Sequence, residues 1–97
     1  MKKLLSKNMQ LKFESTNKFN KELNKLSPKL KKQFFKNLRL FLFNKNHPSL
    51  NFEKISNPFY SIRINKNFRT IFYFKKSNIV CFSYIANHDV YKKIKTL

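Results

Sequence analysis

The spacing of apolar residues changes near the middle of this chain, and that change constrains the possible folds more than any other feature. Between residues 19 and 42, apolar side chains recur every three or four positions, which is the period of a helix. Between residues 59 and 86, they alternate with polar residues or run together, which is typical of strands. Because 97 residues support one domain, we predict helices and a sheet that share a single hydrophobic core.

The first half of the chain predicts a strand and two closely linked helices. Residues 9–14 alternate between apolar and polar side chains, as a half-buried strand does. A short helix follows, and its apolar face is formed by Phe19, Leu23 and Leu26. The pair Ser27-Pro28 is typical of the start of a second helix, which the loop 44–48 ends because proline disfavours helix at the preceding residue. Helices joined so tightly are expected to form an antiparallel hairpin.

The second half predicts strands joined by short turns. The strands span residues 59–65, 68–75 and 79–86. Asparagine is the non-glycine residue that best tolerates positive φ, so residues 65–67 predict a tight turn. Residues 90–94 predict a last helical turn, capped by Asn87 or Asp89. The predicted fold is an α+β domain with an N-terminal strand, an antiparallel helix hairpin packed on an antiparallel sheet of three to four strands, and a short C-terminal helix.

The charge of the chain predicts its kind of partner. There are 22 Lys and Arg residues against 4 Asp and Glu residues, so the formal net charge is +18. Part of the lysine excess reflects a bias toward residues with AT-rich codons, but such a bias does not explain the shortage of acids. Disorder is excluded, because 41% of the residues are hydrophobic and 12 residues are Phe. We therefore expect a polyanionic partner: nucleic acid, a phospholipid surface or an acidic protein.

Three further features bound the class of protein. The single cysteine, Cys81, cannot form an internal disulfide or a cysteine zinc site, and it fits a reducing cytoplasm. No run approaches the roughly 18 apolar residues of a membrane helix. Residues 1–8 are basic, and their apolar stretch is too short for a signal peptide. We therefore expect one cytoplasmic domain over residues 1–97, with a basic leader at residues 1–8 and no membrane partner.

Four short strings in the second half carry a resemblance to a known family. In chain order they are His47-Pro-Ser-Leu50, Tyr60-Ser-Ile-Arg-Ile-Asn65, Phe68-Arg-Thr-Ile-Phe72 and Asn87-His-Asp-Val-Tyr91. With their spacing and the length of the chain, they resemble the RelE/ParE superfamily of type II toxin–antitoxin toxins over residues 9–97. The similarity is to the mRNA interferase branch of that superfamily.

The resemblance implies a RelE-like fold and a ribosome-dependent endonuclease that cleaves mRNA in the ribosomal A site, where it also contacts ribosomal RNA. It implies 2′-OH attack on the scissile phosphate, which leaves a 2′,3′-cyclic phosphate and uses no metal or cofactor. It also implies a cognate antitoxin, whose acidic or amphipathic helix wraps the toxin. This chain has no glycine, although relatives place glycine near these turns, so its turn geometry departs from that of the family.

Cleavage by a 2′-hydroxyl without a metal needs a base, an acid and positive charge beside the phosphorane. Arg63 and Arg69 lie on adjacent predicted strands, and a guanidinium matches two phosphate oxygens. His88 can take or give a proton near pH 7, and Tyr91 lies three residues further along the same helical face. These four residues are the catalytic candidates. Alternatively, the arginines are solvated strand residues, and the turn at His88 only caps a helix that holds Tyr91 as a core lid.

Four more residues are candidates for binding RNA: His47, Lys54, Lys66 and Lys92. Lys54 matches a position where relatives carry a basic residue near the scissile phosphate, whereas a loop histidine such as His47 is more often structural. Glu53 and Asp89 either act as a base or pair with lysines. The lysines of the two helices form an expected positive face for ribosomal RNA, with an affinity that falls as salt rises.

Two alternative functions fit the same residues. One is a non-catalytic inhibitor of DNA gyrase, as in the ParE branch, although binding alone does not require an acid–base pair such as His88 and Tyr91. The other is an inactive remnant that persists as a basic RNA-binding module.

Overall fold

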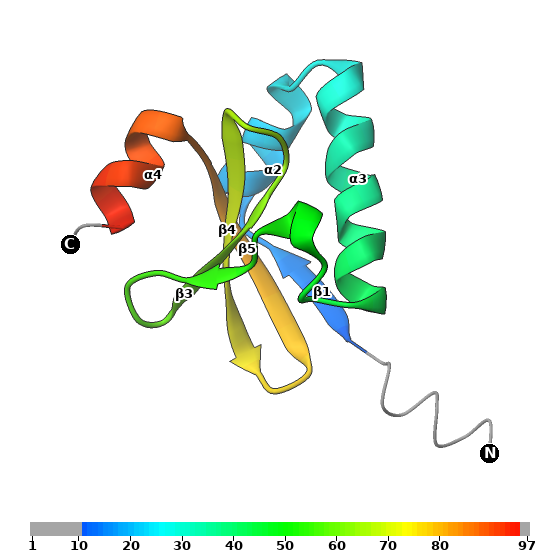
Figure 1. Cartoon of the computed structure of the whole chain (residues 1–97), viewed down its shortest axis with the longest axis vertical. Helices are drawn as coiled ribbons and strands as arrows, with labels where there is room; N and C mark the ends of the chain where they lie inside the picture. Colours follow the sequence, from blue (N-terminus) through cyan, green and yellow to red (C-terminus); the bar gives the residue numbers. More distant parts are fainter. Residues whose placement is uncertain (1–10, 96–97) are drawn as a thin grey trace.

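A computed structural model describes residues 11–95 and places one sheet between helices on its two faces (Figure 1). The elements in chain order are β1 (Lys12–Ser15), α2 (Asn17–Lys25), α3 (Pro28–Phe43), the 3-10 helix η1 (Pro48–Leu50), β2 (Glu53–Lys54), β3 (Phe59–Arg63), β4 (Phe68–Lys76), β5 (Ile79–Asn87) and α4 (His88–Lys95).

The predicted leader at residues 1–8 and the first residues of the predicted N-terminal strand lie outside the described residues. No helix within the described part of the chain has the length and apolarity needed to cross a bilayer.

The sheet confirms the predicted α+β class but is wider than predicted. Its strand order is β1-β5-β4-β3-β2, so it has five strands rather than three or four. β1 runs parallel to β5, whereas the other neighbouring pairs are antiparallel. The extra strand, β2, has two residues, which is too short to give an alternating pattern in the sequence. The direction of β1 depends on how the chain returns across the helices, so a local pattern could not predict it.

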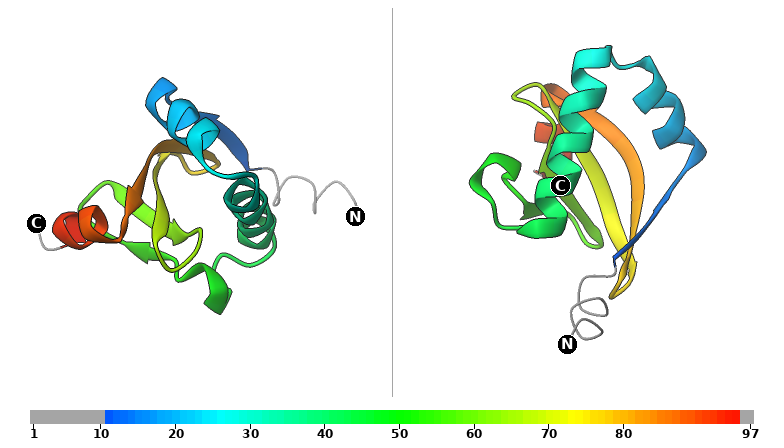
Figure 2. Two further views of the ribbon diagram at one scale, coloured as in Figure 1. Left: turned by 90° about the horizontal axis from the view of Figure 1, so that it is seen from above. Right: turned by 90° about the vertical axis from the view of Figure 1, so that its right-hand side faces the viewer.

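α2 and α3 each begin after a residue whose side chain caps the helix, and Ser27 is the start that the sequence predicts for α3. The Thr16 hydroxyl accepts a hydrogen bond from the Phe19 amide at 3.0 Å, and the Ser27 hydroxyl accepts one from the Leu30 amide at 3.2 Å. Pro28 follows as the first residue of α3. The two further views show α2 and α3 on one face of the sheet and α4 on the other (Figure 2).

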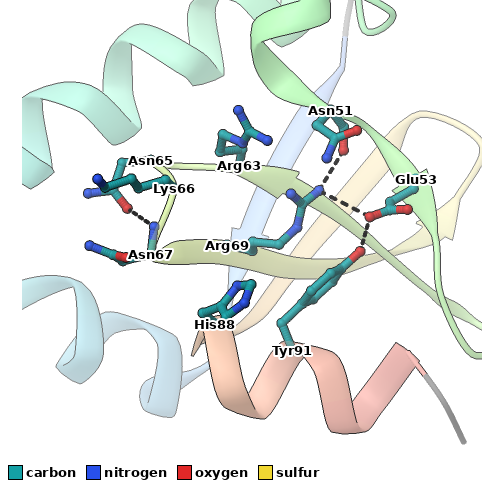
Figure 3. Close-up of a pocket in the computed structure, with 9 residues that line it drawn as sticks. All are labelled: Asn51, Glu53, Arg63, Asn65, Lys66, Asn67, Arg69, His88 and Tyr91. Atoms are coloured by element: carbon teal, nitrogen blue, oxygen red, sulfur yellow. Dashed lines mark hydrogen bonds and ion pairs between the residues drawn. The ribbon is translucent and has the colours of Figure 1, made fainter.

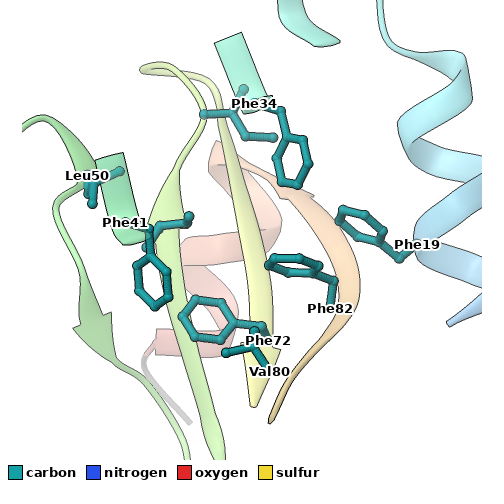
Figure 4. Close-up of a cluster of buried hydrophobic side chains, with 9 residues drawn as sticks. Phe19, Phe34, Phe41, Leu50, Phe72, Val80 and Phe82 are labelled. Atoms are coloured by element: carbon teal, nitrogen blue, oxygen red, sulfur yellow. The ribbon is translucent and has the colours of Figure 1, made fainter. Parts of the chain in front are cut away.

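The main core lies between the sheet and the pair α2–α3. Its buried side chains include Phe19, Phe34, Phe41, Leu50, Phe72, Val80 and Phe82 (Figure 4). Phe72 is completely buried, and its ring centroid lies 5.5 Å from that of Phe41 and 6.1 Å from that of Phe82. Phe19, Phe34 and Phe41 of the two helices are therefore core residues, and the opposite face of the sheet is left for α4 and the candidate site.

An irregularity in β5 fixes α2 against the sheet. The register shifts between Ile71 and Phe72, which pair with Tyr84 and Phe82 and so leave Ser83 as a bulge. The Thr16 hydroxyl donates to the carbonyl of Ser83 at 2.7 Å. The Glu22 carboxylate accepts from the amide of Ile85 at 2.8 Å. The side chains of Thr16, which caps α2, and of Glu22 within α2 thus satisfy two backbone groups of β5.

Candidate active site

A pocket with a volume of about 190 Å³ lies on the α4 side of the sheet, where the β3–β4 turn, β2 and the start of α4 meet (Figure 3). Its lining residues are Asn51, Glu53, Arg63, Asn65, Lys66, Asn67, Arg69, His88 and Tyr91. All four catalytic candidates from the sequence therefore line one pocket.

The two arginines reach the pocket because the β3–β4 hairpin pairs them directly. Arg63 and Arg69 are opposite each other in the antiparallel register. The Arg63 side chain is exposed, whereas Arg69 is only 7% exposed. Like charges at directly opposite positions repel each other, so this hairpin end favours the binding of an anion.

Arg69 is held by polar contacts of two of its guanidinium nitrogens and by the ring of Tyr91. Its Nε donates to the Ser61 hydroxyl at 3.0 Å, and its Nη2 donates to the backbone carbonyl of Asn51. The same Nη2 lies 3.7 Å from Oε2 of Glu53, and the guanidinium carbon lies 4.5 Å from the centre of the Tyr91 ring. The alternative of a solvated strand arginine is therefore wrong for Arg69, because α4 covers this part of the sheet face.

Burial changes the electrostatics of that arginine without removing its charge. Desolvation lowers the pKa of Arg69, and the neighbouring Tyr91 and Glu53 oppose this effect by favouring the charged form. The ordinary pKa of an arginine side chain is so high that the group stays protonated at any working pH. The pocket therefore has a fixed, oriented cation in its wall.

Asn51 provides a contact that the sequence did not predict. It adopts a left-handed conformation with φ of 45° and ψ of 52°, the only positive φ among residues 11–95. This conformation turns its carbonyl toward Arg69. Asparagine tolerates the left-handed region better than other non-glycine residues, and a chain without glycine has to use it there. In the sequence, Asn51 is marked only as an asparagine in a loop. Loop asparagines are too common for this feature to predict a residue of the site.

Glu53 and Tyr91 form the second half of the network. The Tyr91 hydroxyl donates a short hydrogen bond to Oε2 of Glu53, and it accepts one from the Ser61 hydroxyl at 3.4 Å. Tyr91 is 7% exposed, which agrees with the alternative that it forms a lid on the core, but it also lines the pocket as the catalytic prediction requires. Glu53 lies on β2, the strand that the sequence pattern could not reveal.

His88 enters the pocket from the first turn of α4. That helix begins two residues earlier than predicted, at His88, because the Asn87 side chain caps it by accepting from the Val90 amide at 2.9 Å. One of the two predicted caps, Asn87, is thus confirmed. His88 and Tyr91 are three residues apart on the helix, and both rings point from α4 toward the arginines (Figure 3).

The turn between β3 and β4 is stabilised differently from the prediction. Its residues do not use positive φ. Instead, the Asn65 side chain accepts hydrogen bonds from the amides of Asn67 and Phe68 at 2.8 and 2.9 Å. This asparagine turn presents Lys66 to the pocket.

The other three RNA-binding candidates lie away from the pocket lining. Lys54 follows Glu53 on a strand, so the two side chains point to opposite faces. His47 caps η1, where its Nδ1 accepts from the Ser49 amide at 3.1 Å. Lys92 is exposed on α4, one position after Tyr91. Their contact with RNA stays a prediction. Within the described residues, no three His, Cys, Asp or Glu side chains come together as a candidate metal site.

Tyr91 makes the stability of the fold depend on pH in the alkaline range. Burial and the hydrogen bond to Glu53 raise the pKa of Tyr91. The pKa of tyrosine in an unfolded chain is about 10. Because the pKa of Tyr91 is higher in the folded protein, this group stabilises the fold below about pH 10. That stabilisation is lost as the pH rises through the pKa of the folded protein. We therefore expect the urea midpoint of the wild type to fall more steeply above about pH 10 than that of Tyr91→Phe. Equal slopes for the two proteins would contradict this assignment.

Comparison with known proteins connects this chain to others through its fold. No protein-family model and no curated protein sequence matches it. A chain of the archaeal RelE–RelB complex from Pyrococcus horikoshii OT3 matches with a TM-score of 0.63 and 11% identity, over 80% of this chain and 94% of that one. A chain of the E. coli DinJ–YafQ toxin–antitoxin complex matches with a TM-score of 0.67 and 9% identity, over 82% and 94%. YafQ from E. coli strain BL21(DE3) matches with a TM-score of 0.58 and 12% identity, over 82% and 96%. The predicted RelE-like fold is confirmed.

Proposed function

We propose that this protein is the toxin of a type II toxin–antitoxin system, and that it cleaves mRNA in the ribosomal A site by attack of a 2′-hydroxyl on the adjacent phosphate. One observation carries the proposal. Two arginines, a histidine and a carboxylate converge on one pocket of about 190 Å³. The RelE- and YafQ-like fold supports it, since the two matched complexes pair a toxin with an antitoxin.

The arginines would stabilise the charge that develops on the phosphorane. Arg63 is exposed and able to bind phosphate oxygens through its planar fork. Arg69 is fixed by Ser61 and Asn51, so it needs no reorganisation as charge develops. The exposed Arg63 and the fixed Arg69 would thus bind the same phosphorane.

His88 and Glu53 would transfer the protons. In the reaction, a base takes the proton of the 2′-hydroxyl, its oxygen attacks phosphorus, and the bond from phosphorus to the 5′-oxygen breaks as an acid protonates that oxygen. The 2′,3′-cyclic phosphate and a 5′-hydroxyl are the products. His88 and Glu53 enter the pocket from different elements, α4 and β2, which leaves one to act as the base and the other as the acid. Tyr91 positions the carboxylate of Glu53.

The surface charge would bring the protein to the ribosome. The exposed lysines of α2 and α3 include Lys18, Lys21, Lys25, Lys29, Lys32 and Lys36. Glu22, the one acid in these helices, is turned inward and accepts from the Ile85 amide. The net charge of +18 favours ribosomal RNA, and binding through phosphates weakens as salt rises.

The antitoxin would occupy the furrow beside α3, a name we use for two hollows of about 210 and 260 Å³ that are each lined by residues of α3 and by β1 or the residue before it. Its walls include Leu11 and Phe13 on one side and Phe35, Leu38 and Leu42 on the other. Phe35 is 47% and Leu42 40% exposed. Lys45 also lines the furrow, and the surrounding surface is basic. An amphipathic acidic segment matches both its apolar walls and its charge.

Glutamates at the furrow are expected to prevent neutralisation. The double variant Phe35→Glu/Leu42→Glu should still arrest growth when it is co-expressed with the cognate antitoxin, which we expect to be a small acidic protein encoded by a neighbouring reading frame, whereas the wild type should be neutralised. Phe43→Glu is the matched control, because Phe43 is 83% exposed and does not line the furrow. Neutralisation of the double variant would show that the antitoxin binds elsewhere.

Induction in a bacterial host tests the function itself. Wild type, His88→Ala and Arg69→Ala are induced, and mRNA 5′ ends and plasmid supercoiling are measured during growth arrest. New mRNA ends with the wild type and their loss in both variants are expected. Altered supercoiling with intact mRNA would instead identify a gyrase inhibitor, and the absence of both changes would identify an inactive remnant.

A further inference from the structure

Asn37 is a buried polar residue in the middle of α3, and the proposed chemistry does not use it directly. It is 3% exposed and lies on the helix face toward the sheet. Its Nδ2 donates to two consecutive backbone carbonyls, that of Arg63 at 2.6 Å and that of Ile64 at 3.2 Å. Its Oδ1 accepts from Nε2 of Gln33 at 3.1 Å. Every hydrogen-bonding atom of this buried amide is therefore satisfied.

The two carbonyls that Asn37 binds lie where β3 ends and the β3–β4 turn begins. Four residues of this short segment line the pocket: Arg63, Asn65, Lys66 and Asn67. The far side of the turn is closed by the Ile64 amide, which donates to the Phe68 carbonyl at 2.9 Å, and by the side chain of Asn65. Asn37 is thus the contact through which α3 fixes the base of the turn.

We propose that Asn37 is a positioning residue that holds the β3–β4 turn so that Arg63 and Lys66 face the substrate phosphate. Without its amide, two carbonyls near the core lose their donor, and the end of β3 is free to move. Arg69 is anchored separately by Ser61 and Asn51, so it keeps its place. Loss of the Asn37 side chain should therefore displace the exposed Arg63 but leave the buried Arg69 in place. The link to cleavage rests on the proposed function, whereas the link to the turn does not.

Hydrogen exchange tests the structural part without any activity. In Asn37→Ala, the amides of Ile64 and Phe68 should exchange at least about tenfold faster relative to amides of β5 than in the wild type. Gln33→Ala leaves both bonds from Asn37 to the backbone in place and should change this ratio much less. Leu30→Ala removes a partly buried core side chain of the same helix and should leave the ratio unchanged. An unchanged ratio in Asn37→Ala would overturn the proposal.

A double-variant cycle tests the functional part on ribosomes that carry a defined mRNA. Asn37→Ala should lower kcat/KM for cleavage by about tenfold, but it should have a smaller effect in an Arg63→Ala background, where only the placement of Lys66 is left to lose. Leu30→Ala should have an equal effect in both backgrounds. Independent effects of Asn37→Ala and Arg63→Ala would refute the positioning role.

Two further results keep the outcome interpretable. If Asn37→Ala does not fold, Asn37→Ser retains one hydroxyl donor and should show the same pattern with a smaller amplitude, and an unchanged pattern in that variant would also refute the role. If the wild type does not cleave RNA, the proposed function fails, yet the exchange ratios still decide whether Asn37 holds the turn.

Discussion

Arg69→Ala is expected to reduce the rate of RNA cleavage by about a hundred- to a thousandfold, which is the usual effect of removing a preorganised group that stabilises developing charge. The side chain is fixed by Ser61 and Asn51. Single-turnover cleavage of mRNA on purified ribosomes measures the loss. Arg39→Ala is the matched control, since Arg39 is an exposed arginine of α3 and its removal changes the net charge equally.

Arg69→Lys separates charge from geometry in the same assay. Lysine keeps the positive charge, but a single ammonium cannot reproduce the fork that contacts Ser61, Asn51 and Glu53 together. We expect cleavage to stay low and the free energy of unfolding to fall by about 1 to 3 kcal/mol, because buried partners lose their donor. Full activity of either Arg69 variant would show that the buried arginine has no part in the reaction.

Phe72→Ala is expected to produce the largest loss of stability, about 3 to 5 kcal/mol. Phe72 is completely buried on the central strand β4, and its ring contacts those of Phe41, Phe52, Phe74 and Phe82. Its removal leaves a cavity that rings held by the sheet and by α3 cannot fill. Urea denaturation followed by far-UV circular dichroism measures the change.

Phe43→Ala provides the comparison for that loss. Phe43 has the same side chain but is 83% exposed at the end of α3, so its removal should change stability by less than about 0.5 kcal/mol. Similar losses for the two alanine variants would mean that the core does not lie between the sheet and α3.

The sequence was a good guide to the elements because their patterns are local. Ser27 and Pro28 define the start of α3 through a cap and a fixed φ, and the structure has both. Because side chains alternate along a strand, Ile62 lies in the core and the neighbouring Arg63 lines the pocket on the other face. The direction of β1 could not be predicted, since it depends on pairing with β5, far along the chain. The strand β2 could not be predicted because two residues are too few to show an alternating pattern.

The candidate site was predictable only in part, for the same reason. Arg63, Arg69, His88 and Tyr91 were identifiable from their chemistry and from strand and helix spacing, and they line one pocket. The burial of Arg69 could not be identified from the sequence, because this burial requires α4 to fold over the sheet. The carbonyl of Asn51 and the amide of Asn37 act through backbone geometry, for which the sequence holds no distinctive pattern.

The central claim is that this pocket promotes attack by a 2′-hydroxyl, and one substitution in the RNA tests it most directly. Ribosomes are programmed with an mRNA that carries either ribose or 2′-deoxyribose at the cleaved position, and the purified protein is added. We predict cleavage of the ribose mRNA, with a 2′,3′-cyclic phosphate and a 5′-hydroxyl at the new ends, and no cleavage at the deoxyribose. Cleavage of both mRNAs at that position, or of neither, would contradict the claim.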